Sequence, residues 1–158
     1  MSLIQKLNEA YCTLAKLNPR PPAPEVSYVV KKDSIWVHEC LFNLEPSIVR
    51  LSLDATYLLT DKDSFLDIVA WDWVDSWLWV KDKFDCENHA IAFKSHVDRY
   101  FGLNQVGIVI DYKAGHGYNL VVFPDGEVLL FEPQNDSLFM WDDIHAILYA
   151  LKDAFVLI

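Results

Sequence analysis

The stretch DCENHAIAFKSHVDRYFG, residues 85–102, carries the clearest local signal in this chain of 158 residues. Asp85 is a good helix N-cap, because its short side chain can accept a hydrogen bond from the free backbone N–H groups of the first turn. Gly102 suits the other end, since glycine readily takes the left-handed conformation that ends a helix. Between them, apolar residues recur at helical spacing and predict one buried stripe: Cys86, Ala90, Phe93, Val97 and Phe101.

Three β-strands are expected directly after this helix. Residues 106–112, 116–123 and 127–132 are rich in β-branched and aromatic residues. The turn sequences between them, KAG at 113–115 and PDG at 124–126, are short enough to join neighbouring antiparallel strands. The sequence therefore predicts an α+β fold in which the helix packs on an antiparallel β-sheet.

The rest of the chain is expected to complete a single domain over residues 1–158. Its length suffices for one hydrophobic core but does not divide comfortably into two. The pattern predicts an N-terminal helix over 1–18, a proline-rich extended connector over 19–25 and the core motifs over 85–136. It also predicts strands over 27–37 and 47–59, one or two helices over 61–79, a helix over 141–152 and a last strand over 154–158.

Composition argues against several classes of partner. The net charge of -10 and the absence of a basic stripe disfavour nucleic acid and anionic membrane surfaces. No run of about eighteen apolar residues suggests a membrane span, and the first residues do not read as a secretion signal. Cys12, Cys40 and Cys86 follow neither a disulfide framework nor a zinc spacing, which favours a reducing, cytoplasmic location. The oligomeric state does not follow from the composition.

Cys86 is the first candidate for chemistry. At the first turn of a helix, free N–H groups and the helix dipole favour a thiolate, although free cysteines are often simply buried. His116, between Gly115 and Gly117, strengthens the case, because an imidazole beside a thiol can take its proton and later give it to a leaving group. His89, one turn after Cys86, is a weaker candidate for the base, since a shared helix leaves little room for a substrate between them.

The register of the predicted hairpin selects a third residue. A type I turn followed by a left-handed Gly126 places His116 opposite Gln134, with Glu132 one diagonal step away on the same face. A two-residue loop would instead turn Glu132 to the other face. Glu132 is the preferred orienting group because a carboxylate stabilises an imidazolium. Gln134 and Asn135 are alternates, either for this role or as substrate or oxyanion contacts.

Three short blocks of the sequence resemble a known family: DCENHA at 85–90, GHGYNL at 115–120 and FEPQND at 131–136. They are similar to the Cys, His and Glu blocks of the papain-like cysteine peptidase domain that forms the C-terminal half of a mushroom agglutinin, and of related stand-alone phage and bacterial proteins. The resemblance implies a papain-like or transglutaminase-like fold with Cys86 as nucleophile, His116 as base and Glu132 as orienting group. The chain differs in showing no β-trefoil lectin domain, so the resemblance carries no glycan target.

The same resemblance implies dependence on calcium or a similar ion, although the residues themselves require no cofactor. Calcium prefers several oxygen ligands, and with no EF-hand spacing present an irregular site would draw on Asp82, Asp85 and Glu87. A solvated acidic surface is the alternative explanation of these three side chains.

Two functions are compatible with these features. The first is a cysteine hydrolase, a peptidase or amidase that attacks a peptide or other amide substrate through Cys86, His116 and Glu132. The alternative is a catalytically inactive binding or assembly module of phage origin that keeps the fold for interaction.

Overall fold

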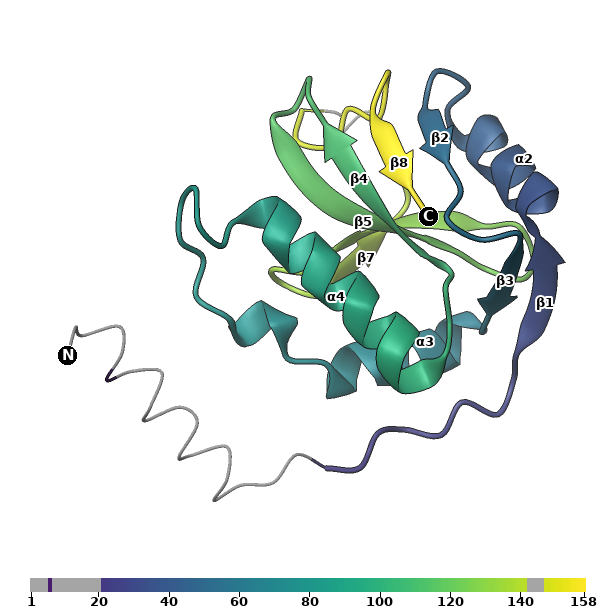
Figure 1. The fold of residues 1–158 in the computed structure, drawn as a ribbon, viewed down its shortest axis with the longest axis horizontal. Coiled ribbons are helices and arrows are strands. Elements are labelled where there is room, and N and C mark those ends of the chain that lie inside the picture. Colours follow the sequence, from purple (N-terminus) through teal and green to yellow (C-terminus); the bar gives the residue numbers. More distant parts are fainter. Residues whose placement is uncertain (1–5, 7–20, 142–146) are drawn as a thin grey trace.

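The protein has a mixed α/β fold, seen in a computed structural model that describes residues 6, 21–141 and 147–158 (Figure 1). The expected N-terminal helix over 1–18 lies outside the described residues, apart from Lys6. The elements are β1 (Val30–Asp33), α2 (Ser34–Leu44), β2 (Val49–Leu51), β3 (Thr56–Leu59), α3 (Lys62–Trp71), a 3-10 turn η1 (Val74–Ser76), α4 (Cys86–Phe101), β4 (Val106–Asp111), β5 (His116–Val122), β6 (Val128–Glu132), β7 (Ser137–Phe139) and β8 (Phe155–Leu157).

The strands form two sheets. Strands β1 and β3 make a two-stranded antiparallel sheet, and the other six follow the order β2-β8-β4-β5-β6-β7. The predicted meander of β4, β5 and β6 is antiparallel, as expected. However, β2 pairs with β8 in parallel, so the large sheet is mixed rather than antiparallel. A parallel pair needs a long connection, and nearly all other elements lie between these two strands in the chain.

Both faces of the large sheet are covered. Alternate residues of a strand point to opposite faces. On β5, Leu120 and Val122 face the core beneath α2, whereas Val121 faces the core beneath α3 and α4. Figure 1 shows α4 crossing in front of β4 and β5, with α3 beside it. The helix that carries Cys86 therefore packs on the sheet and against α3.

Helix α4 begins and ends at the predicted residues. The backbone N–H of Asp85 donates to Oδ1 of Asn88 at 3.1 Å, which is one half of a capping box. Gly102 has φ of +65° and its N–H donates to the carbonyl of Asp98, which is the expected left-handed stop. Ala90, Phe93 and Val97 of the predicted stripe are fully buried. None of the described helices has the length and apolar character needed to cross a membrane.

The predicted strand over 27–37 is wrong for its second half. Residues 34–44 form α2, capped by Asp33, whose Oδ1 accepts the N–H of Trp36 at 2.8 Å. The β-branched and aromatic residues suggested a strand, but Val37, Cys40 and Leu41 recur at helical spacing and are the residues that α2 buries. Packing on the sheet outweighed local strand propensity here.

The C-terminal region also differs from the prediction. In the described part of 141–152, residue 141 and residues 147–152 form turns and irregular structure rather than a helix. Strand β7 was not expected and adds an edge to the sheet beside β6. The last strand is present as β8.

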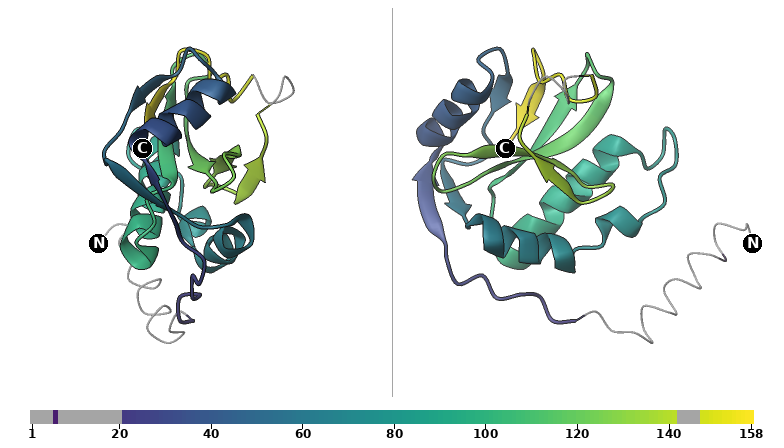
Figure 2. Two further views of the ribbon diagram at one scale, coloured as in Figure 1. Left: turned by 90° about the vertical axis from the view of Figure 1, so that its right-hand side faces the viewer. Right: turned by 180° about the vertical axis from the view of Figure 1, so that it is seen from behind.

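Residues 21–29 run as an extended segment outside the helices towards β1 (Figure 2). Side chains of the domain hold it at both ends. Nε1 of Trp71 donates to the carbonyl of Pro21 at 2.8 Å, and the Thr60 hydroxyl donates to the carbonyl of Tyr28 at 2.6 Å. Prolines that cannot donate backbone hydrogen bonds suit such a segment.

Candidate functional site

The hairpin of β5 and β6 places His116 beside Glu132. Phe123 and Glu127 close its turn, Gly126 has φ of +92°, and Val122 pairs with Val128. This is the register that the three-residue turn predicts. Continued down the ladder, it brings Nε2 of His116 to 2.7 Å from Oε2 of Glu132. The carboxylate is buried, whereas the His116 side chain is 18% exposed and so remains in partial contact with solvent.

Cys86 lies against the strand that carries His116. Its sulfur accepts the backbone N–H of Gly117 at 3.4 Å, and its own S–H donates to Oε2 of Glu87 at 3.5 Å. Cys86 is half-buried, whereas Cys40 on α2 is buried. Asn119 helps to hold α4 against the sheet near Cys86. Its Nδ2 donates to the carbonyls of Ala90 on α4 and Gly107 on β4, both at 3.0 Å.

Glycine at 117 is what permits this approach of helix and strand. A Cβ at this position would lie 2.9 Å from Cα of Glu87, closer than real Cβ atoms come to a neighbour. Gly115, on the other side of His116, has φ of +65°, which side-chain-bearing residues rarely adopt. The two glycines that flank His116 thus serve the approach to Cys86 and the turn before β5.

The electrostatics at Cys86 differ from the expectation for a helix N-terminus. Burial raises the pKa of the Cys86 thiol, and the side chain of Glu87 raises it further, whereas the Gly117 N–H opposes both effects. The neutral thiol is therefore favoured in the resting site. Reaction at this sulfur consequently needs a base to remove the proton.

Four hydrogen bonds hold the Glu132 carboxylate. Oε2 faces His116 Nε2 and accepts the Tyr149 hydroxyl at 3.0 Å, while Oε1 accepts the backbone N–H and the side-chain amide of Gln134 at 3.2 and 3.1 Å. Burial raises the pKa of Glu132, but the bond and charge of His116, the Gln134 N–H and the Tyr149 hydroxyl outweigh burial and lower it. The carboxylate is thus kept ionised beside the imidazole.

The alternative candidates for the orienting group and the base have other contacts. Gln134 supports Glu132, and Oδ1 of Asn135 accepts the N–H of Ser137, which shapes the turn into β7. His89 is buried, and its two ring nitrogens face the carbonyls of Asp85 and Trp77 at 2.8 and 3.3 Å. These contacts occupy His89 and leave His116, the residue before the Gly117 that contacts Cys86, as the base candidate.

Tyr149 and Gly117 are functional candidates that sequence reasoning missed. Tyr149 falls in a segment predicted to be helical, and its reach to Glu132 depends on a turn that no local pattern signals. The sequence marks Gly117 only as a residue that flanks His116, and its N–H bond to Cys86 cannot be foreseen without the position of α4.

Of the three candidate metal ligands, Asp85 and Glu87 lie together with Cys86, whereas Asp82 is not part of this group. Asp85, Cys86 and Glu87 each offer one atom, all within 4.8 Å of one another, whereas Asp82 takes part through its backbone N–H, which donates to Asp85 Oδ2 at 2.9 Å. Calcium takes six to eight oxygen ligands, and a thiol is a poor ligand for it. Two carboxylates do not fit a calcium site, so no chemical step is assigned to an ion. Dependence on calcium stays a prediction from the resemblance.

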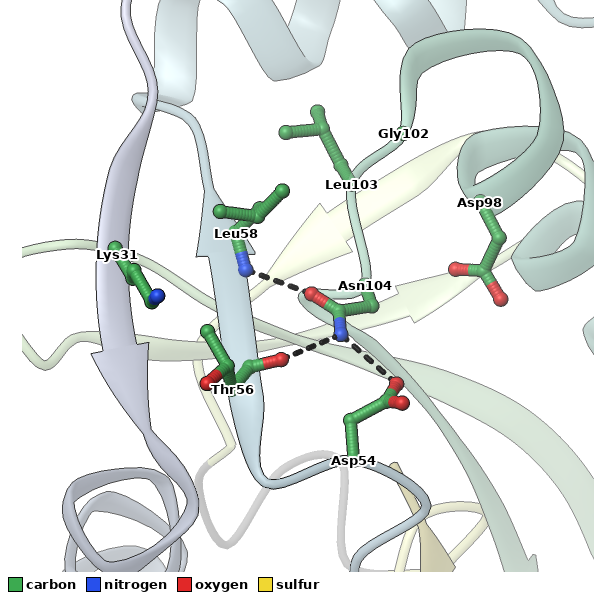
Figure 3. A pocket seen from close by; sticks show the side chains of 8 residues that line it. All are labelled: Lys31, Asp54, Thr56, Leu58, Asp98, Gly102, Leu103 and Asn104. Carbon is green, nitrogen blue, oxygen red and sulfur yellow. Dashed lines mark hydrogen bonds between the residues drawn. The ribbon is translucent and has the colours of Figure 1, made fainter.

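A separate hollow lies at the far end of α4 from Cys86 (Figure 3). Asn104 bridges it, accepting the N–H of Leu58 at 2.7 Å and donating to Asp54 and to the Thr56 carbonyl. The Asn104 amide is thus committed to fastening β3 beside the loop that follows α4. The residues around this hollow hold β3 in place, and none of them belongs to the Cys86 site.

Comparison with known proteins identifies the family to which the chain belongs. Residues 27–149 match the family model of the ricin-type β-trefoil lectin C-terminal domain, and the chain belongs to this family. The predicted relation to the C-terminal domain of a mushroom lectin is therefore confirmed.

Two solved structures share the fold. One, the "PSL1a-E64 complex", is 23% identical with a TM-score of 0.66, over 81% of this chain and 51% of that chain. The other is Polyporus squamosus lectin bound to the human-type influenza-binding epitope Neu5Aca2-6Galb1-4GlcNAc, 24% identical with a TM-score of 0.64, over 81% of this chain and 49% of that chain. The chain thus spans about half the length of these structures. No curated protein matches it.

These findings correct part of the sequence-based prediction. The assignment to hydrolases and thiol proteases is wrong, because the matching family and the neighbouring structures are lectins. The predicted peptide or amide substrate is wrong for the same reason, since the molecule named with one neighbour is a saccharide epitope. The mixed α/β class stands, whereas a papain-like fold is not shown by these neighbours.

Proposed function

We propose that this chain is a binding module of the lectin family in which Cys86 is a nucleophilic thiol that captures its ligand covalently. One observation carries the proposal. Cys86 Sγ accepts the backbone N–H of Gly117, and the preceding residue, His116, has its Nε2 2.7 Å from Oε2 of Glu132. A thiol, an imidazole base and an orienting carboxylate are the components of nucleophilic chemistry. The helix-borne thiol, strand-borne histidine and adjacent carboxylate also support a papain-like architecture, which we include in the proposal.

One of the two neighbouring structures adds support. It is named as a complex with E64, an epoxide that alkylates thiols, and it shares the fold of this chain. In such a reaction the sulfur bonds to an epoxide carbon, the thiol proton passes to His116, and His116 returns it to the oxygen freed when the ring opens. Each step uses a group that the site provides.

Two neighbouring apolar side chains are exposed on the segment that precedes α4. Leu78 is 72% exposed and Trp79 is 48% exposed, on the segment that leads to the first turn of α4. Adjacent exposed apolar side chains can form an apolar patch of the kind found at ligand-binding sites.

The test is labelling of the intact chain with E64, followed by whole-protein mass measurement and peptide mapping. The expected result is an adduct on Cys86 that is absent in Cys86→Ser, with buried Cys40 unlabelled as an internal control. Failure of Cys86 to form the adduct while the protein is folded would overturn covalent capture. It would leave the second candidate, a module that binds without covalent chemistry.

A further inference from the structure

Tyr149 contacts both partners of the His116–Glu132 pair. Its hydroxyl donates to Oε2 of Glu132 at 3.0 Å, and this is the oxygen that lies 2.7 Å from Nε2 of His116. Its ring meets the imidazole edge-on, with centroids 5.5 Å apart and an interplanar angle of 66°. Gln134 donates only to Oε1 of Glu132. Tyr149 and His116 are therefore the two side chains bonded to Oε2.

Tyr149 is itself held in place from several sides. Nε1 of Trp141 donates to its carbonyl at 2.7 Å, and its ring packs edge-on against Phe139 and Tyr118, with centroids 4.9 Å away in both cases. Two residues on, the N–H of Leu151 donates to the buried carboxylate of Asp111 at 3.0 Å. A hydroxyl fixed in this way restricts the rotation of the carboxylate that it binds.

We propose that Tyr149 is a positioning residue for the Cys86 site, acting through Glu132, an inference that rests on the proposed function. A hydrogen bond to a carboxylate favours its charged form, so the hydroxyl helps to keep Glu132 an acceptor. An acceptor at this place holds the proton of His116 on Nε2 and leaves Nδ1 as the nitrogen that can take a proton from Cys86. Tyr149 would thus set both the orientation and the tautomer of the base.

The chain offers a matched control in Tyr118. Its ring also lies against His116, with centroids 5.6 Å apart, but its hydroxyl donates to Asp111 at 3.3 Å rather than to Glu132. Tyr149→Phe and Tyr118→Phe each remove one oxygen from a ring beside the same histidine. They differ in the carboxylate that loses a donor.

The test has two readouts on the full chain: a carbon-13 NMR titration of the Glu132 carboxyl, and the rate of Cys86 alkylation by E64 against pH. In Tyr149→Phe we expect the pKa of Glu132 to rise by about half a unit or more and the alkylation rate to fall roughly threefold to tenfold. In Tyr118→Phe we expect the Glu132 titration to stay where it is. An unchanged titration in Tyr149→Phe, or an equal shift in both variants, would overturn the proposal.

The two readouts separate this inference from the proposed function. If Cys86 of the wild-type protein does not react with E64, covalent capture fails, and the titration still decides whether Tyr149 acts on Glu132. If Tyr149→Phe reacts as fast as the wild type, the positioning role is wrong and covalent capture stands. Should the variant not fold, the wild-type protein provides the check. A slowly exchanging Tyr149 hydroxyl proton is expected there. It should be lost in Glu132→Leu, which leaves no acceptor at this place; retention would contradict the contact.

Discussion

Nε2 of His116 lies 2.7 Å from Oε2 of Glu132, across the adjacent antiparallel strands β5 and β6. The Glu132 side chain is 4% exposed and the His116 side chain 18% exposed, so the carboxylate sits behind the imidazole as seen from solvent. This order places the charge where it can orient the ring without being reached by a ligand. It is the relationship on which the proposed chemistry of Cys86 depends.

Glu132→Gln should destabilise the fold in a pH-dependent way. The pKa of Glu132 is lowered in the folded protein from its ordinary value of 4.5, so its charge stabilises the fold above that pH and the contribution is lost as pH falls through the folded pKa. We expect urea denaturation at neutral pH to show a loss of about 1–3 kcal/mol in the free energy of unfolding.

The gap between wild type and Glu132→Gln should narrow as the pH is taken below 4.5. Glu127→Gln is a suitable control, because Glu127 lies at the other end of the same hairpin and forms an exposed ion pair with Lys62. A gap that stays constant with pH would show that packing, rather than the charge of Glu132, is responsible.

Gly117→Ala should push α4 and β5 apart. The new Cβ would meet backbone atoms of Glu87 at 2.9–3.0 Å, which a side-chain rotation cannot relieve. We expect a loss of about 1–3 kcal/mol in unfolding free energy together with slower alkylation of Cys86.

Gly107→Ala is the matched comparison for Gly117→Ala. Its Cβ would meet side-chain atoms of Leu120 and Ile158 at 3.1–3.4 Å, which are longer contacts than those at Gly117. It should cost less stability and leave the reactivity of Cys86 unchanged. Equal effects of the two variants on Cys86 would argue against a specific role for the approach at Gly117.

Glu87→Gln should make Cys86 more reactive at neutral pH. Burial is the largest cause of the raised pKa of the Cys86 thiol. The Glu87 side chain raises this pKa further, through its hydrogen bond and its charge. Removing the charge lowers the thiol pKa and therefore increases the fraction of thiolate at a given pH. Iodoacetamide rates measured against pH should show the midpoint moving to lower pH, whereas a move in the opposite direction would contradict this reading of the site.

The site could be predicted further from sequence than the rest of the fold because its determinants are local. Asp85 and Gly102 bound α4, and the turn ending at Gly126 sets the register that brings His116 to Glu132. The parts that were missed depend on contacts distant in sequence. Helix α2 forms because its stripe packs on the sheet, and β2 joins β8 across most of the chain.

Function was harder to predict than geometry. The three sequence blocks pointed to the C-terminal domain of a mushroom lectin, and the family match agrees. They could not reveal the Glu87 carboxyl at the thiol or the Tyr149 hydroxyl at Glu132, which alter the chemistry of the same residues. Those contacts arise where separate elements meet, so a motif read along the chain does not contain them.

The most direct test of the central claim is the rate of iodoacetamide alkylation of Cys86 in the folded wild-type protein and in His116→Ala, located by peptide mapping with Cys40 as the buried reference. If Cys86 is a nucleophile served by His116, the wild-type rate at neutral pH should exceed the His116→Ala rate by about tenfold or more. Equal rates in the two proteins, with Cys40 unreactive in both, would contradict the claim that His116 activates this thiol.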